Sequence, residues 1–260
     1  MLTNAEIYEM LGTDAGKYSL SVFASLPSTN SYIKEHADAL PDGYAVIASN
    51  QTAGRGRMGR SFYSPEGTGI YMSILIKKQL TAGESVYITS CAAVAVCRAI
   101  TECTGIKPGI KWVNDIFING RKVCGILTEG SIEPANGMLN YAVLGIGINV
   151  NPPEKGFPKD IADTAGTVSA EYDETLPGRL AAAVLVNFRR LSDNLHSAET
   201  LEEYRALCFI PGREIDVIRG GIVRRAKALD IDESFRLRVK YETGEEEYLS
   251  SGEISIRSAE

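Results

Sequence analysis

The stretch KWVNDIFINGRKVCGILTE, Lys111–Glu129, decides how this chain is expected to fold. Together with the residues beside it, the stretch predicts three short strands, Ile110–Val113, Asp115–Ile118 and Lys122–Ser131. Between the last two, Asn119-Gly120 favours a tight hairpin turn, because both residues tolerate positive φ. The stretch therefore predicts a sheet in which consecutive strands are neighbours.

Short β-rich runs recur on both sides of this stretch, at Tyr44–Ser49, Gly69–Lys77 and Leu139–Asn149, the last after a second turn dipeptide, Asn136-Gly137. Helical segments lie between and after them, at Thr29–Ala39, Glu84–Cys103, Glu174–Leu195 and Ala198–Leu207. Glu84–Cys103 is rich in small apolar residues, which suit a helix packed closely on a sheet. We expect an α+β fold, with helices packed on a mixed β-sheet.

After Pro211-Gly212 the pattern changes to closely spaced strands alone, expected at Glu214–Ile218, Gly221–Leu229, Phe235–Val239, Glu246–Ser250 and Ile254–Ile256. Turn signals such as Gly220-Gly221 separate them. About fifty residues of this kind suggest a small barrel of the SH3 type. We therefore expect two domains, residues 1–210 and 211–260.

The composition excludes several classes of function. The 260 residues carry 27 basic and 33 acidic side chains, a net charge of −6, which argues against a surface built to coat nucleic acid. We see no apolar run of roughly 18 residues and no secretory signal, so no membrane association is expected. Five cysteines without a CxxC pair suggest reduced, packed thiols in the cytoplasm. With two histidines, a His-based zinc site or nucleophile is disfavoured.

Gln51–Arg60, QTAGRGRMGR, is the most unusual stretch. Between Asp42 and Glu66 the sequence has no carboxylate, so three arginines form a local charge of +3. The interleaved glycines free the backbone, so that amides and guanidinium groups can converge on an anion. The alternative is a solvated flexible loop. The GxGxxG match here is weak, because a glycine-rich loop and a strand follow instead of a helix.

Three further segments carry candidate chemistry. In the opening stretch, Lys111 and Asp115 would share one side of a strand, next to a phosphate and its metal ion, or would form an ordinary surface ion pair. Trp112 is either a core or a site residue. In Leu144–Asn151, LGIGINVN, two glycines open one face of a buried strand, and its asparagines either bind a ligand or cap a turn. Pro27–Asn30, PSTN, either caps a helix or binds a polar heterocycle.

Taken together and in this order, the four segments resemble the catalytic core of biotin–protein ligases. The matching elements are Ser28-Thr29-Asn30, the loop Gly54–Arg60, Lys111–Asp115 and Gly145–Val150. The resemblance implies a core like that of class II aminoacyl-tRNA synthetases, followed by the small barrel. It also implies two reactions: biotin and ATP give biotinyl-5′-AMP, and biotin then passes to a lysine of a biotin carboxyl carrier protein.

The resemblance also implies roles for individual residues. Biotin would be bound by Ser28, Thr29, Asn30, Gln51, Arg55, Gly56, Arg57, Lys122 and Gly125. ATP would be bound by Arg55, Arg57, Lys111, Asn114 and Asn149. Lys111, Arg57 and Asp115 would be catalytic, and Asp115 would position Mg²⁺ or Lys111. Two departures from the family pattern are Met58, where another arginine is frequent, and Val113, where proline is usual.

Two other functions compete with this reading. A lipoate–protein ligase or acyl transferase would resemble the same fold, although the arginine loop and the barrel favour biotin. A non-catalytic nucleic-acid-binding module would use the same arginines, but aromatic residues are not interleaved with them and the chain is acidic. Because only about 20 residues precede the core, we expect no winged-helix domain and no DNA binding. Pairing through an apolar β-edge would give a homodimer, and the sequence leaves both the oligomeric state and the task of the barrel open.

Overall fold

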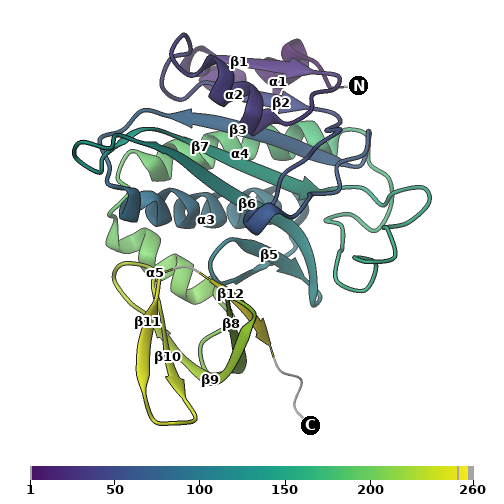
Figure 1. Cartoon of the computed structure of the whole chain (residues 1–260). Coiled ribbons are helices and arrows are strands. Elements are labelled where there is room, and N and C mark those ends of the chain that lie inside the picture. The colour runs from purple at the N-terminus through teal and green to yellow at the C-terminus, as the bar shows by residue number, and fades with distance from the viewer. Residues whose placement is uncertain (1, 251, 257–260) are drawn as a thin grey trace.

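Seven strands form a mixed sheet in the order β1-β2-β3-β7-β6-β5-β4 in the computed structural model, which describes residues 2–250 and 252–256 (Figure 1). β1 and β2 are parallel, and the other neighbouring strands are antiparallel. The strands are β1 (Leu20–Phe23), β2 (Ala45–Ala48), β3 (Gly69–Ile76), β4 (Gly109–Lys111), β5 (Asp115–Ile118), β6 (Arg121–Ile132) and β7 (Leu139–Asn149).

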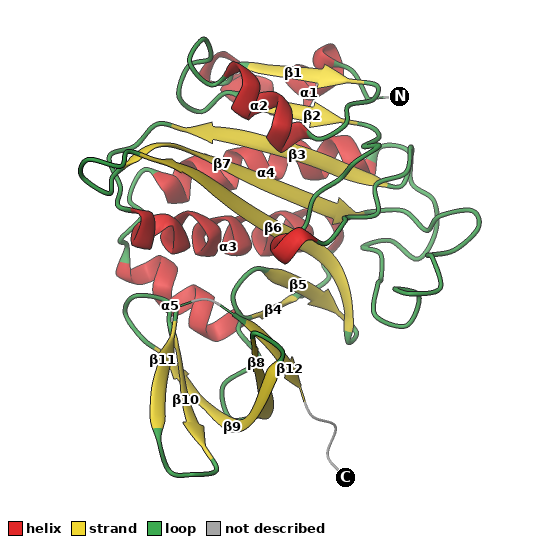
Figure 2. Ribbon diagram, viewed as in Figure 1, coloured by secondary structure: helices red, strands yellow, loops and turns green. Residues whose placement is uncertain are grey.

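Helices cover both faces of this sheet (Figure 2). The α-helices are α1 (Asn4–Leu11), α2 (Thr29–His36), α3 (Ser85–Thr104), α4 (Leu176–Ser192) and α5 (Ala198–Leu207), and three short 3₁₀ helices are η1 (Gly12–Lys17), η2 (Arg57–Gly59) and η3 (Ala82–Glu84). α3 and α4 pack against each other and against one face, whereas α2 packs on the other face, over β2, β3 and β7. The sheet is thus the middle layer of the domain.

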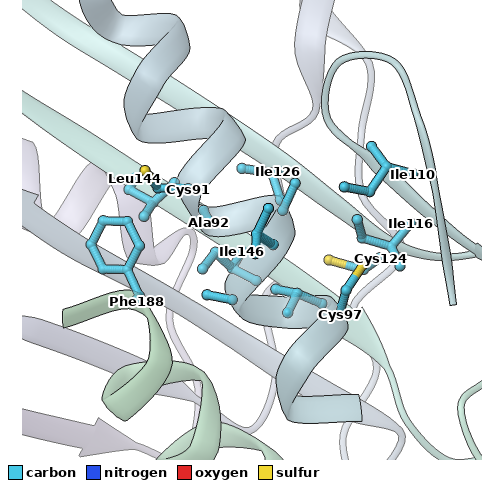
Figure 3. Close-up of a cluster of buried hydrophobic side chains, with 14 of the residues drawn as sticks. Cys91, Ala92, Cys97, Ile110, Ile116, Cys124, Ile126, Leu144, Ile146 and Phe188 are labelled. Atoms are coloured by element: carbon cyan, nitrogen blue, oxygen red, sulfur yellow. The ribbon is translucent and has the colours of Figure 1, made fainter. Parts of the chain in front are cut away.

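Alternation along the strands separates two hydrophobic clusters. Ile74 and Ile76 of β3 lie in the larger cluster with α3 and α4, whereas Leu75 lies in the smaller cluster with α2. Adjacent residues on a strand point to opposite faces, so a sheet buried on both sides needs apolar residues at consecutive positions. Figure 3 shows the larger cluster, where Cys97 and Ala92 of α3 lie among Ile126 and Ile146 of the central strands.

On length and apolar composition, the segment Ala82–Thr104 would pass for a membrane-spanning helix, which inspection of the sequence did not anticipate. In its most apolar window, 67% is buried inside the protein. Packing between the sheet and α4 therefore accounts for its apolar character. Alanines such as Ala92 and Ala95 are fully buried, and their small size lets the helix approach the sheet closely.

The C-terminal strands form a separate five-stranded antiparallel sheet in the order β11-β10-β9-β8-β12. They are β8 (Glu214–Arg219), β9 (Ile222–Ile231), β10 (Leu237–Tyr241), β11 (Glu246–Leu249) and β12 (Glu253–Ile256). This sheet lies beside α5 and the β4–β5 hairpin (Figure 2). The expected α+β class, with a larger sheet and helices followed by a small all-β unit, is confirmed.

Several local predictions were wrong. α1 and β1 were not anticipated, and the predicted strand Ile110–Val113 ends at Lys111. At Asn136-Gly137 only the glycine has positive φ, and the two strands are joined by residues 133–138 instead of a two-residue turn. Asn119-Gly120, in contrast, has φ values of 49° and 75°, as the hairpin turn requires.

The cysteines are free thiols, as predicted, and all but Cys103 are buried. Burial raises the pKa of the Cys91 thiol to about 12 and that of Cys208 to about 11. A thiol with a raised pKa forms little thiolate, which is the reactive form. These side chains therefore behave as small apolar core residues.

Candidate active site

On the α2 face, the sheet has no side chains of its own where three glycines of β6 and β7 are neighbours. Gly125 and Gly147 are paired across the strands, and Gly145 is two residues along β7. A Cβ atom at Gly147 would lie 2.6 Å from the ring of Phe62, and one at Gly145 would lie 2.3 Å from Asn30 Oδ1. These glycines let side chains from outside the sheet approach its backbone, as the two glycines of LGIGINVN suggested.

Polar side chains close one end of this bare face. Ser28 is the N-cap of α2, and its hydroxyl accepts a hydrogen bond from the Ser31 backbone amide. Both the backbone amide and the hydroxyl of Thr29 donate to Gln51 Oε1, at 2.9 and 3.2 Å. Gln51 Nε2 in turn donates to Ser64 Oγ at 3.1 Å. One residue of PSTN therefore caps the helix, and the next is held against Gln51.

Asn30 belongs to a buried network that the sequence did not reveal. Ser73 Oγ donates to Asn30 Oδ1 at 2.5 Å, and Asn30 Nδ2 donates to Glu129 Oε2 at 2.8 Å. Glu129 Oε1 also accepts from Lys34 Nζ at 2.5 Å and lies 3.2 Å from Arg55 Nη2. The amide of Asn30 is thus fixed from both ends.

Glu129 is charged despite its partial burial. Burial raises the pKa of the Glu129 carboxyl, but hydrogen bonds from Asn30 and Lys34 and the charges of Lys34 and Arg55 outweigh it, so the pKa lies below its usual value. Glu129 therefore neutralises part of the positive charge of the arginine loop, which the neighbouring sequence does not show. The carboxylate that faces Arg55 comes from β6, 74 positions further along the chain.

Arg57 joins three separate parts of the chain. It begins η2, and its guanidinium donates to Asn114 Oδ1 at 2.5 Å and to the carbonyl oxygen of Gly252 at 3.1 Å. The next residue, Met58, has a positive φ of 55° and is 72% exposed. The arginine loop is thus held against the β4–β5 hairpin and against the start of β12, while its tip projects into solvent.

The β4–β5 hairpin presents Lys111 and Asp115 side by side. The two residues are directly paired across the antiparallel strands, so they share one face, but as partners on two strands and not as alternate residues of one. The connection, residues 112–114, contains a cis peptide bond between Trp112 and Val113. Asp115 Oδ1 lies 2.7 Å from Lys122 Nζ and accepts from Asn114 Nδ2 at 2.9 Å.

Two cavities adjoin on this face. The smaller, which we call the slot, is lined by Ser28, Thr29, Asn30, Gln51, Arg55, Phe62, Tyr71, Met72, Gly125, Leu127, Gly145, Ile146 and Gly147. The larger, of about 170 Å³, we call the cationic pocket, and its polar lining comprises Arg55, Arg57, Arg60, Ser61, Lys111, Asn114, Asp115 and Lys122. Arg55, Phe62, Gly125 and Leu127 line both cavities. A molecule in the slot would therefore lie next to the cations.

All but one of the predicted site residues line one or both of these cavities. Ser28, Thr29, Asn30 and Gln51 line the slot, Gly56, Arg57, Lys111, Asn114, Asp115 and Lys122 line the cationic pocket, and Arg55 and Gly125 line both. Asn149 lines neither cavity, and its side chain donates to the Gly166 carbonyl oxygen at 3.1 Å. Gly56, Arg57 and Lys122, predicted with the biotin residues, line the cationic pocket and not the slot.

Sequence reasoning missed Phe62, Ser73 and Glu129. Glu129 could have been found from strand periodicity, because positions 125, 127 and 129 of β6 share one face. Among the described residues, no group of three or more His, Cys, Asp or Glu side chains could hold a metal ion. Asp115 is the one carboxylate among the described residues that line the cationic pocket. A metal ion there would need further oxygen ligands from a bound phosphate.

Both parts of the chain match patterns of known protein families. The pattern of the biotin/lipoate A/B protein ligase family matches residues 22–149, and that of the biotin protein ligase C-terminal domain matches residues 211–257. The bifunctional ligase/repressor BirA of Bacillus subtilis is 39% identical over 67% of this chain, which there spans about half (54%) of that relative's length. The biotin--[acetyl-CoA-carboxylase] ligase of Mycobacterium tuberculosis is 29% identical over 88% of this chain and 86% of its own.

A solved structure agrees. The biotin protein ligase from Aquifex aeolicus in complex with biotin and ATP is 25% identical and superposes with a TM-score of 0.72. The superposition covers 93% of this chain and 99% of that one. Both sheets of the present chain therefore have counterparts in that enzyme.

Proposed function

We propose that this chain, which belongs to the biotin/lipoate A/B protein ligase family, is a biotin–protein ligase. It activates biotin with ATP and transfers the biotinyl group to a lysine of a biotin carboxyl carrier protein, such as that of acetyl-CoA carboxylase. Residues 1–210 would carry both reactions, and residues 211–260 would form the C-terminal domain. The free thiols are consistent with a cytoplasmic location.

The observation that carries this proposal is the junction of the two cavities. The slot offers amide and hydroxyl groups at one end to the ureido group of biotin, which has both donors and acceptors. Its volume is about 30 Å³, so the Phe62 ring, which covers Gly147, would have to move to admit the ring system. The valeryl chain would lead past the shared wall toward the cationic pocket, which requires the Phe62 ring to move off Gly125. The carboxylate of biotin would then meet the α-phosphate of ATP among cations.

In the first reaction, a carboxylate oxygen of biotin attacks the α-phosphorus of ATP. A new oxygen–phosphorus bond forms, the bond from the α-phosphorus to the bridging oxygen breaks, and pyrophosphate leaves with its electron pair. Two anions must approach each other, so the residues contribute mainly charge and position. Lys111 and Arg57 line the pocket and would stabilise the charge on the reacting phosphate. Arg55 would bind the biotin carboxylate in competition with Glu129.

In the second reaction, the neutral amine of the carrier lysine attacks the acyl carbon of biotinyl-5′-AMP. An amide bond forms, AMP leaves, and the amine loses one proton to solvent. The mixed anhydride is already activated, so a histidine base is not required. Mg²⁺ bound with the nucleotide would neutralise phosphate charge, and Asp115 together with phosphate oxygens would hold it.

A lipoate–protein ligase is the alternative within the family, since the matched pattern includes both activities. The polar end of the slot favours biotin, because Thr29 and Gln51, which already hydrogen-bond each other, can also exchange hydrogen bonds with a ureido group, whereas an apolar dithiolane ring offers none. The named relatives and the C-terminal domain pattern point the same way.

ATP–pyrophosphate exchange tests the proposed function. Purified protein with MgATP and labelled pyrophosphate should incorporate label into ATP when biotin is added, and should not do so when lipoate replaces it. Exchange with lipoate alone would support the alternative. Exchange with neither acid would contradict both.

A further inference from the structure

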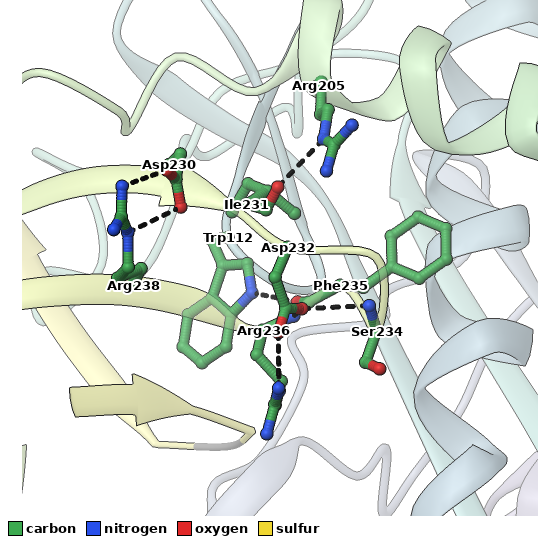
Figure 4. Close-up of polar contacts among 9 residues, drawn as sticks. All are labelled: Trp112, Arg205, Asp230, Ile231, Asp232, Ser234, Phe235, Arg236 and Arg238. Atoms are coloured by element: carbon green, nitrogen blue, oxygen red, sulfur yellow. Dashed lines mark hydrogen bonds and ion pairs between the residues drawn. The ribbon is translucent and has the colours of Figure 1, made fainter.

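The turn between β9 and β10 inserts an aromatic side chain into the larger domain. Asp232 shapes this turn, since its side chain accepts hydrogen bonds from the backbone amides of Ser234 and Arg236 (Figure 4). Phe235 has a positive φ of 55° and is 1% exposed. In Figure 4 its ring points away from the strands of the C-terminal sheet, toward the helices. We call Phe235 the knob.

Three aromatic side chains of the larger domain form the socket for the knob. The ring of Phe235 makes edge-to-face contacts with Tyr87 of α3 and Tyr204 of α5, with centroids 5.4 and 5.2 Å away. The indole N–H of Trp112 donates to the carbonyl oxygen of Phe235 at 2.8 Å. Trp112 and Tyr204 are buried. Such a contact between well-packed aromatic rings fixes relative positions more sharply than a polar surface contact does.

Two socket residues are directly connected to the β4–β5 hairpin, which lines the cationic pocket. Trp112 directly follows Lys111, and the hydroxyl of Tyr204 donates to the backbone carbonyl of Val113 at 3.1 Å. The next residue, Asn114, accepts from Arg57. Two of the three residues in the connection between Lys111 and Asp115 are therefore anchored to the knob or to a residue that touches it: Trp112 to Phe235 itself, and Val113 to Tyr204.

We propose that Phe235 is a positioning residue for adenylation. The knob fixes the β4–β5 connection and thereby the placement of Lys111, Asn114 and Asp115 at the α-phosphate. The inference rests on the proposed function, since it assigns the C-terminal domain a role in the first reaction. Small displacements matter, because misplacing a reacting group by about 1 Å can lower a rate roughly 100-fold.

The slot is built on other elements. Its polar residues lie on α2 and the adjoining loops, and its floor is formed by β3, β6 and β7. None of the contacts described for the knob involves a residue that lines the slot. Unseating the knob should therefore lower kcat for adenylation while leaving biotin binding unchanged. A merely structural role would weaken both together.

The test compares two variants with a matched control. Phe235→Leu shortens the knob, and Tyr204→Phe removes the hydroxyl that holds the Val113 carbonyl. Arg205→Met is the control, because Arg205 Nε also ties α5 to the C-terminal sheet, at the Ile231 carbonyl, without touching the hairpin. Titration calorimetry measures biotin binding, and pyrophosphate exchange measures kcat.

We expect kcat to fall about 100-fold in Phe235→Leu and about tenfold in Tyr204→Phe, with the Kd for biotin within about twofold of wild type in both. Arg205→Met should keep the wild-type kcat. Trp112 is the single tryptophan of the chain, so a red shift of its emission would report that the knob has moved.

The outcomes separate the two claims. A wild-type protein without biotin-dependent exchange would overturn the proposed function and this role with it. An active wild type whose kcat is unchanged in both variants, or whose biotin Kd rises in step with the loss of kcat, would overturn the positioning role alone. Tyr204→Phe removes a single oxygen atom and keeps the ring against the knob, so a wild-type kcat in this variant would overturn the link from the socket to the hairpin even where Phe235→Leu fails to fold.

Discussion

Replacing Gly145 by Ala should damage the slot through Asn30. The new Cβ would lie 2.3 Å from Asn30 Oδ1, whereas ordinary contact begins near 3.4 Å, so the amide would have to move by about 1.1 Å. The sheet backbone is fixed on both sides by β3 and β6 and cannot yield instead. Asn30 would therefore lose its contacts to Ser73 and Glu129.

The magnitude follows from those two hydrogen bonds. A neutral hydrogen bond contributes about 1 kcal/mol and one to a charged group about 2 kcal/mol, so their loss amounts to about 3 kcal/mol. For a protein of this size, that would lower Tm by roughly 6–12 °C. If Asn30 binds biotin, the loss of one hydrogen bond of about 1 kcal/mol to the ligand should raise the Kd roughly five- to tenfold.

Differential scanning fluorimetry and titration calorimetry with biotin measure the two effects. Gly83→Ala is the control, because its Cβ would have one neighbour at 3.9 Å and the backbone there is not left-handed. The control should match wild type in both assays. A Gly145→Ala protein with unchanged Tm and unchanged biotin Kd would refute both the packing argument and the placement of biotin in the slot.

Four further predictions concern other parts of the molecule. Lys111→Ala and Arg57→Ala should each lower the rate of pyrophosphate exchange by at least ~100-fold. The control, Lys107→Ala, replaces an exposed lysine and should keep the wild-type rate. Wild-type rates in the Lys111 and Arg57 variants would show that neither residue contributes to the reaction. The Glu129 pKa lies below its usual 4.5, so this carboxylate stabilises the fold above that pH and its contribution is lost as the pH falls through the lower folded value. The Tm advantage of wild type over Glu129→Gln should therefore shrink between about pH 7 and about pH 3, and an advantage independent of pH would contradict this account. Gly120→Ala should cost about 1 kcal/mol in thermal unfolding, because the turn needs φ of 75° there; an equally stable variant would mean that the turn can change type. Under native conditions Ellman's reagent should label the buried thiols far more slowly than denatured protein, and rapid labelling would contradict the buried positions of Cys91, Cys97, Cys124 and Cys208.

The sequence predicted elements best where a single local signal dominates. Leu139–Asn149 and Asp115–Ile118 match the observed strands, and Ala198–Leu207 matches the observed helix. β1 was missed because Leu20–Phe23 is four residues long and pairs in parallel with β2, so no hairpin turn announces it. Local patterns identify the elements, but parallel pairing is decided by the rest of the sheet.

The sequence indicated which segments contribute to the candidate site, but not the contacts between side chains of different segments. Arg55, Lys111 and Gln51 were identified because each lies in a distinctive local pattern. Glu129 was missed because its partners come from α2 and the arginine loop, and Phe235 was read as the start of a strand although it lies in the turn before β10. Side chains that act through distant partners have no local signature.

The most direct measurement is mass spectrometry of a biotin carboxyl carrier domain incubated with this protein, biotin and MgATP. The account predicts a carrier that gains one biotinyl group on its acceptor lysine, dependent on both substrates and lost when Lys111 is replaced by Ala. A carrier of unchanged mass, together with a wild-type protein that binds biotin and ATP, would contradict the claim that these two cavities form a biotin–protein ligase.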